Sequence, residues 1–275
     1  MKKTLTLVLL GLLGLTGGLR AQTDVEQDPE VGGRLSFNLN KKIIKGWHIN
    51  LEEEVRFDDN FASFNRFHTT LSTSYKIHPN LKVALGYALI NRFDREEDKF
   101  GTPRHRIYAD ITGTYRYGDW QFSLRERVQM THRTDSFNGY QNPANAWMLK
   151  SRLKVSYKAF RRWVPYLSVE MRHTLNAPVI KANYDGTYYL TDGGSQEGEP
   201  GWFLDGFNGM YLNRWRGTVG VDYRIDRNSA LDVYLIADYS SEKEVDANAE
   251  GTKLKAYTIE KGFNGWLCVS YSYSF

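Results

Sequence analysis

The feature that most constrains the fold is a period-2 alternation of apolar and smaller or polar residues that runs through most of the chain. In WLCVSYSYSF (266–275), every second residue is apolar or aromatic, and these residues are Leu267, Val269, Tyr271, Tyr273 and Phe275. Alternate positions of this kind are called one parity. Successive side chains of a strand point to opposite faces, so this pattern predicts β-strands with one apolar face. Ten segments follow it: 47–57, 67–77, 81–93, 105–117, 120–132, 147–157, 165–173, 211–225, 231–239 and 266–275.

Most of these segments are 11–15 residues long, whereas strands of globular proteins have about 5–6 residues and membrane-spanning strands about 9–11. Short connections alternate with long ones, as in outer-membrane barrels. The short ones are 78–80, 118–119, 159–164 and 226–229, and the long ones are 94–104, 133–146, 174–210 and 240–263. The sequence therefore predicts an all-β fold, a single transmembrane antiparallel up-and-down β-barrel.

The strand count has two alternatives, and ten strands are favoured over twelve. Twelve would follow if 253–275 contains two strands. Segment 32–42 also alternates, but its turn toward Trp47 would be periplasmic, so as a spanning strand it would have to begin outside the cell. It could instead be a periplasmic extension of the first hairpin.

The N-terminus is typical of a cleaved export signal. Lys2 and Lys3 precede a short apolar run, and Ala21 ends a small-residue cleavage motif. We expect a signal peptide at 1–21, a short segment at 22–32 and the barrel at 33–275. Cleavage would leave 33 basic and 32 acidic residues, a balance that gives no general case for nucleic-acid binding. With Cys268 as the one cysteine, no intrachain disulfide can form.

Mean hydropathy is −0.53, and no later apolar run is long enough for a membrane helix. The low mean hydropathy and the lack of such a run are both compatible with a membrane barrel, because half of the residues of each strand face a polar lumen.

The terminal aromatics Tyr271, Tyr273 and Phe275 resemble the signal that the barrel-assembly machinery reads in bacterial outer-membrane proteins. More narrowly, the stretches LEEEVRFDDN, RHRIYADITGTYRYGDWQFSLRERVQ and VPYLSVEMRHTL are similar to the family called domain of unknown function 2490. The resemblance implies a barrel in the outer membrane of a Gram-negative-type bacterium, with outer-membrane lipids and lipopolysaccharide as partners. It implies no activity, catalytic residue, cofactor or metal, and leaves the oligomeric state open.

The strand positions that alternate with the apolar ones, on the opposite face, hold many charged residues. The predicted lumen basic cluster comprises Arg106, Arg116, Arg125, Arg127, Arg152, Arg172, Arg214 and Arg216, and the acidic partners are Glu52, Glu54, Asp110, Glu170 and Asp222. One interpretation is a structural barrel whose paired charges plug the lumen. The other is a narrow passage for small solutes, anionic ones if arginine forks contact phosphate or carboxylate groups.

Two other functions are open. An outer-leaflet lipase or acyltransferase could place Ser151 beside a histidine such as His132 on the lipid-facing side, although an interfacial polar role is favoured for both. A glycan or ligand could bind the aromatic-rich loop 174–210. Glu53 and Glu126 also fall on the lipid-facing parity, where a β-bulge could re-aim them or a protein contact could cover them.

Overall fold

The computed structural model describes residues 22–95, 97–135, 138–183, 187–189, 195–197, 201–249 and 254–275. The predicted signal peptide lies outside the described residues. Within those ranges, no helix has the length and apolar character needed to cross a membrane.

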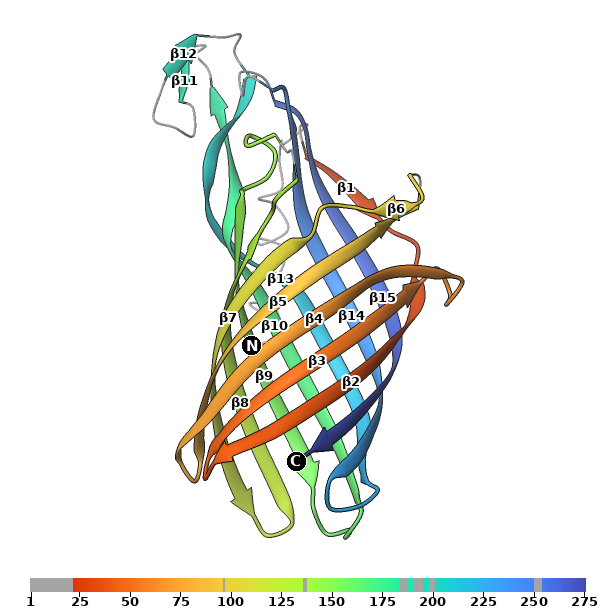
Figure 1. Ribbon diagram of the computed structural model, residues 1–275. Helices are drawn as coiled ribbons and strands as arrows, with labels where there is room; N and C mark the ends of the chain where they lie inside the picture. Colours follow the sequence, from red (N-terminus) through yellow and green to blue (C-terminus); the bar gives the residue numbers. More distant parts are fainter. Residues whose placement is uncertain are drawn as a thin grey trace, which may run out of the picture.

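Eleven long strands of the described chain form a closed barrel (Figure 1). Each strand pairs antiparallel with the next one in the barrel, as expected for an up-and-down meander. The strands are β2 (Glu30–Ile44), β3 (Trp47–Asp58), β4 (Ser63–His78), β5 (Leu81–Asp94), β7 (Arg104–Tyr117), β8 (Trp120–His132), β9 (Asn145–Tyr157), β10 (Trp163–Asn183), β13 (Gly201–Arg224), β14 (Ser229–Ala247) and β15 (Leu254–Ser274).

The barrel closes through a parallel pair, because an odd number of alternating strands brings its first and last members together in the same direction. β2 lies beside β15 with Glu30 opposite Asn264 and Asn40 opposite Ser274. The predicted β-barrel is confirmed, and its strand count falls between the expected ten and twelve. The additional strand is the segment 32–42, which spans as part of β2 and is not a periplasmic extension. Upstream, the short β1 (Gln22–Glu26) also runs parallel to β15.

The two ends of the barrel differ. At one, the turn end, successive strands are joined by the short connections 45–46, 79–80, 118–119, 158–162 and 225–228. Gly46 and Gly118 take positive φ values of 87° and 56°, which glycine adopts without steric cost. The opposite end, the loop end, carries the short connection 59–62 and otherwise longer ones, including β6 (Lys99–Phe100) beside β5.

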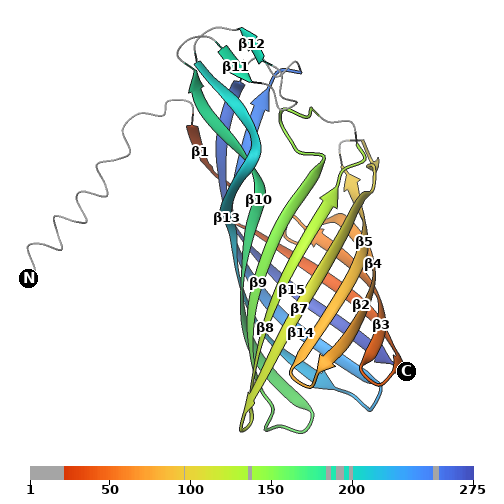
Figure 2. The ribbon, with the colours of Figure 1, turned by 90° about the vertical axis from the view of Figure 1, so that its left-hand side faces the viewer.

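Two of the predicted long loops are largely strand. β10, β13, β14 and β15 continue past the rim at the loop end, where the hairpin β11 (Thr187–Tyr189) and β12 (Ser195–Glu197) also lies (Figures 1 and 2). Between Thr174 and Ile180, the pairing of β10 with β13 contains several register shifts. These shifts break the period-2 pattern, so the sequence is typical of a loop although backbone pairing continues.

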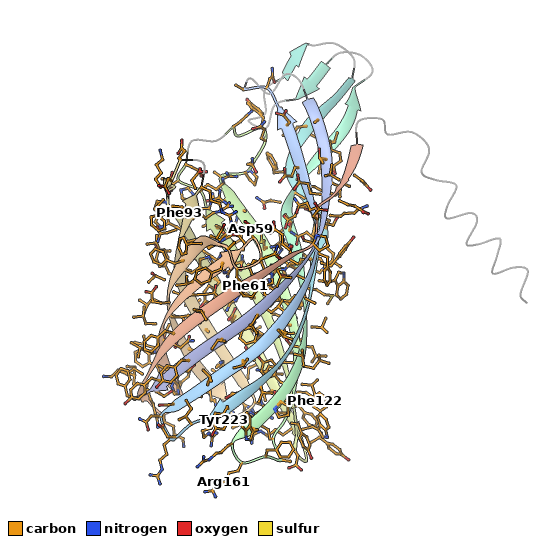
Figure 3. All side chains as sticks on the ribbon, turned by 90° about the vertical axis from the view of Figure 1, so that its right-hand side faces the viewer. Asp59, Phe61, Phe93, Phe122, Arg161 and Tyr223 are labelled. Atoms are coloured by element: carbon orange, nitrogen blue, oxygen red, sulfur yellow. The ribbon has the colours of Figure 1, made fainter. Side chains whose placement is uncertain are left out.

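The apolar side chains cover the outside of the barrel. Leu85 is 62% exposed and Leu235 is 55% exposed, whereas Arg34 and Glu170 on the inside are 5% and 6% exposed. Figure 3 shows side chains projecting all around the barrel wall, with Phe122 and Arg161 toward the turn end. This distribution is the inverse of that in a water-soluble protein and defines a transmembrane barrel with a polar lumen.

Glu53 and Glu126 keep the outward parity that the sequence predicts. No register shift occurs at either residue, so no bulge re-aims them. Each carboxylate instead accepts a hydrogen bond from a hydroxyl on the next strand: Thr69 Oγ1 donates to Glu53 at 2.9 Å, and Ser151 Oγ donates to Glu126 at 2.5 Å. An outward carboxylate is therefore partly satisfied within the barrel wall.

Candidate functional site

Three cavities lie along the inside of the barrel. A loop-end cavity of about 650 Å³ includes Arg92 and Arg104 in its lining, and a turn-end cavity of about 680 Å³ includes Lys82 and Arg116. A central cavity of about 360 Å³ lies between Glu54 on β3 and Glu170 on β10. No residue lines two of these three cavities.

The lining of the central cavity is strongly basic. Its four acidic residues are Glu52, Glu54, Glu170 and Asp232, and its nine basic residues are Arg34, Arg56, Arg106, Arg125, Arg127, Lys150, Arg152, Lys154 and Arg216. The turn-end cavity is lined by Lys76, Lys82 and Arg116 and by no carboxylate among the described residues. The positive field of the lumen therefore extends from its centre to the turn end.

The first concentration of charge, the β8–β9 cation patch, consists of Arg125, Arg127, Lys150 and Arg152. Arg125 lies directly opposite Arg152 across the two strands, and Arg127 lies directly opposite Lys150. Like charges in facing positions destabilise a strand pair. In the described part of the chain, no ion pair links Lys150 or Arg152 to a carboxylate, and the Arg152 Nε is buried without a hydrogen-bond partner.

The second concentration, the arginine row, crosses four neighbouring strands. Arg34 on β2 faces Arg56 on β3, which faces Arg66 on β4, which in turn faces Arg92 on β5. Arg34 and Arg56 line the central cavity and Arg92 lines the loop-end cavity. Glu54 pairs with Arg56 at 2.5 Å. The row therefore runs from the central cavity to the loop-end cavity.

Several predicted lumen residues form buried ion pairs. Asp110 binds Arg127 through two bonds of 2.6 and 2.7 Å. Glu170 on β10 links Arg125 on β8 to Arg214 on β13. One of its oxygens lies 2.9 Å from Arg125 and the other lies 3.2 Å from Arg214. Arg216 binds Asp238 in the same two-pronged manner as Arg127. These pairs hold part of the predicted basic cluster in fixed orientations.

Small residues opposite large ones shape the wall of the central cavity. A Cβ placed on Gly86 would lie 2.2 Å from the Tyr108 ring, and one on Gly220 would lie 2.8 Å from the Tyr166 ring. Glycine is required at both positions because the aromatic rings occupy that space. The Tyr108 ring supports the Arg127 guanidinium at 3.8 Å, and Tyr166 donates a hydrogen bond of 3.0 Å to Asp232.

Three further predicted residues do not line the central cavity. Arg116 lines the turn-end cavity, and Asp222 lies opposite Asp232 on β14. Arg172 lies above the centre, where its Nε donates to Asn213 at 2.9 Å and it pairs with Glu242. The predicted lumen residues therefore form one central group, with Arg116 nearer the turn end and Arg172 nearer the loop end.

The terminal aromatics lie on the outside at the turn end. Tyr271 stacks on Phe37 of β2 with ring centroids 5.8 Å apart, and Tyr273 stacks on Phe275 at 6.1 Å. The backbone N–H of Phe275 donates to the Asn40 carbonyl at 3.0 Å. Their role as an assembly signal stays a prediction.

The structure does not bring His132 and Ser151 together as the pair that a lipid-modifying enzyme would need. His132 lies opposite Asn145, and Ser151 is six positions further along β9, opposite Glu126. At about 3.4 Å per strand residue, the two side chains are too far apart for a nucleophile and its base. For the loop proposed as a binder, many side chains lie outside those described, including Tyr188, Tyr189 and Trp202.

Sequence reasoning missed Arg34, Arg56 and Arg66 as site residues. Arg34 and Arg56 lie on the lumen face of their predicted segments, and Arg66 extends the lumen face of 67–77 by one position; this was the available signal. Only the pairing register shows that the three stand side by side.

Taken together, the fold and its interior define a membrane β-barrel with a basic lumen. The chain belongs to the family described as protein of unknown function (DUF2490), whose model matches residues 35–187.

Two solved structures show similarity in fold. The NanC porin in its rhombohedral crystal form is 11% identical with a TM-score of 0.42, and the match covers 90% of this chain and 99% of that one. OmpT, an outer-membrane protein of Vibrio cholerae, is 12% identical with a TM-score of 0.32, and the match covers 84% of this chain and 62% of that one. No curated protein matches the sequence.

Proposed function

We propose that this protein is an outer-membrane barrel that binds small anionic solutes in its lumen and provides a narrow passage for them. The observation that carries the proposal is the direct opposition of cations in the β8–β9 cation patch, at the wall of a cavity with nine basic and four acidic residues. A bound anion would offset this repulsion with charge-assisted hydrogen bonds.

The basic character of the central and turn-end cavities supports a route as well as a site, whereas the loop-end cavity is mixed, with three arginines and four carboxylates in its lining. An anion entering at the loop end would meet Arg92 and Arg104, then the rest of the arginine row, and then the turn-end lysines. Long arginine and lysine side chains line the central cavity, which has the smallest volume of the three. A small conductance with strong anion preference is therefore expected.

The outer-membrane location rests on the apolar exterior, the predicted export signal and the barrel architecture. A helical inner-membrane protein would not expose alternating strands to lipid.

The test is the reversal potential of the purified barrel in a planar bilayer under a potassium chloride gradient. Wild type should pass anions preferentially, and the double variant Lys150→Gln/Arg152→Gln should lose much of that preference. Arg161→Gln/Arg162→Gln is the matched control, because these two exposed residues of the turn-end connection 158–162 lose the same total charge outside the lumen. If wild type gives no conductance, the proposed passage is refuted. If wild type conducts anions and cations equally, the proposed preference for anionic solutes is refuted.

A further inference from the structure

Two histidines form an outward-facing pair near the loop end of the barrel. His105 on β7 lies directly opposite His132 on β8. Facing residues of antiparallel strands have Cβ atoms about 4.5–5.5 Å apart, so the two imidazoles stand side by side. His132 is exposed, and Ile107, the next residue of β7 on this face, is 49% exposed.

Each imidazole is oriented by an oxygen at its Nδ1 atom. The Tyr87 hydroxyl lies 2.7 Å from the Nδ1 of His105, and the Asn145 side-chain oxygen lies 2.8 Å from the Nδ1 of His132. When Nδ1 carries the proton and donates to oxygen, the lone pair resides on Nε2. Metal-binding histidines are held in this manner, with the second ring nitrogen donating to an oxygen.

We propose that the Nε2 atoms of His105 and His132 bind one divalent first-row transition-metal ion, with water completing its coordination. Imidazole ligands suit copper, nickel and zinc. The described residues contain no group of three or more His, Cys, Asp or Glu placed to hold a metal, so the site has two protein ligands and open positions. This inference is independent of the anionic solute, because the pair lies on the outer surface.

The sequence alone predicts no metal site because the two histidines are 27 positions apart and match no ligand spacing. The register of β7 and β8 brings them together, and the hydrogen bonds show which nitrogen is left for a ligand. His173, a third outward histidine, lies opposite Leu149 on β9 and so lacks a partner histidine there. It serves as the matched control.

The experiment is calorimetric titration of untagged, folded barrel in detergent with Cu²⁺ at neutral pH. Wild type should bind with a saturable high-affinity phase of one equivalent that His105→Ala and His132→Ala each weaken at least about tenfold, whereas His173→Ala leaves it unchanged. Tyr87→Phe removes the oxygen at His105 and should weaken binding about 10- to 100-fold, as loss of such partners generally does. Heat-modifiable gel mobility verifies that each variant is folded.

Electron paramagnetic resonance gives a readout that altered folding would not imitate. The Cu²⁺ spectrum should show two imidazole nitrogens in wild type and one in each alanine variant. The proposal is overturned if wild type shows no saturable phase, if the two alanine variants bind as wild type does, or if His173→Ala weakens binding equally.

Discussion

Replacing Glu170 with glutamine tests the idea that a few carboxylates hold together an interior with surplus positive charge. Glu170 is 6% exposed, and its two oxygens pair with Arg125 at 2.9 Å and with Arg214 at 3.2 Å. The Nε atoms of both arginines are already buried without a hydrogen-bond partner. The substitution preserves the size of the side chain, so it isolates the loss of charge.

The expected loss in free energy of unfolding is about 3–5 kcal/mol, the cost of removing one partner from a buried ion pair. The glutamine amide can accept from one arginine only and presents its NH₂ group to the other. With Glu170 neutral, the central cavity retains three acidic residues against nine basic ones. Stability should fall while the preference for anions rises.

The assay is urea unfolding of the barrel in lipid vesicles, followed by tryptophan fluorescence. Glu97→Gln is the control, because Glu97 pairs with Lys99 at 2.8 Å with both side chains more than half exposed. Exposed pairs of this kind contribute little, so its unfolding curve should overlay that of wild type. A loss below about 1 kcal/mol for Glu170→Gln, or one equal to that of the control, would refute the reasoning.

Three further predictions concern the wall, the lipid face and a turn. Gly86→Leu should cost at least about 1–3 kcal/mol by overpacking against the Tyr108 ring, while Gly113→Ala, where a Cβ meets nothing within 4 Å, should be better tolerated in the same unfolding assay. Leu85→Arg on the lipid face should destabilise the barrel by up to about 4 kcal/mol in vesicles, and an unchanged midpoint would place Leu85 away from lipid. Two backbone N–H groups donate to Asp226 at 2.7 Å and hold its pKa below the ordinary aspartate value. Its contribution to stability should therefore be complete above that ordinary value and disappear as the pH falls through the lowered pKa, and unfolding of Asp226→Asn across this acidic range should lack that component.

Much of the barrel could be predicted because most strands show the apolar alternation within their own sequence. Alternation in a segment such as 105–117 depends only on which face meets lipid, so the strand and its outward residues follow from local sequence. The long segments around Thr174 and Gly262 were harder, because strands that continue beyond the membrane need not alternate. Pairing there comes from the partner strand and not from the local pattern.

The sequence could predict which residues of the candidate site face the lumen, but it could not predict which of them lie next to one another across strands. Parity placed Arg125 and Arg152 in the lumen, yet it could not show that they stand directly opposite each other. The arginine row depends on registers that three separate turns determine, and Arg34 became a lumen residue only because β2 closes the barrel. Register is a property of pairs of strands, and a single sequence specifies it weakly.

The parallel closure between β2 and β15 has a consequence for how this protein can be tagged and followed. Glu30 begins its strand at the loop end, and Phe275 ends the chain at the turn end. The two ends of the spanning chain therefore face different compartments, in contrast to an even-stranded barrel, whose ends share one. A protease or label applied to whole cells would reach one of these ends and not the other, so a pair of terminal tags would report the orientation of the barrel in a single experiment.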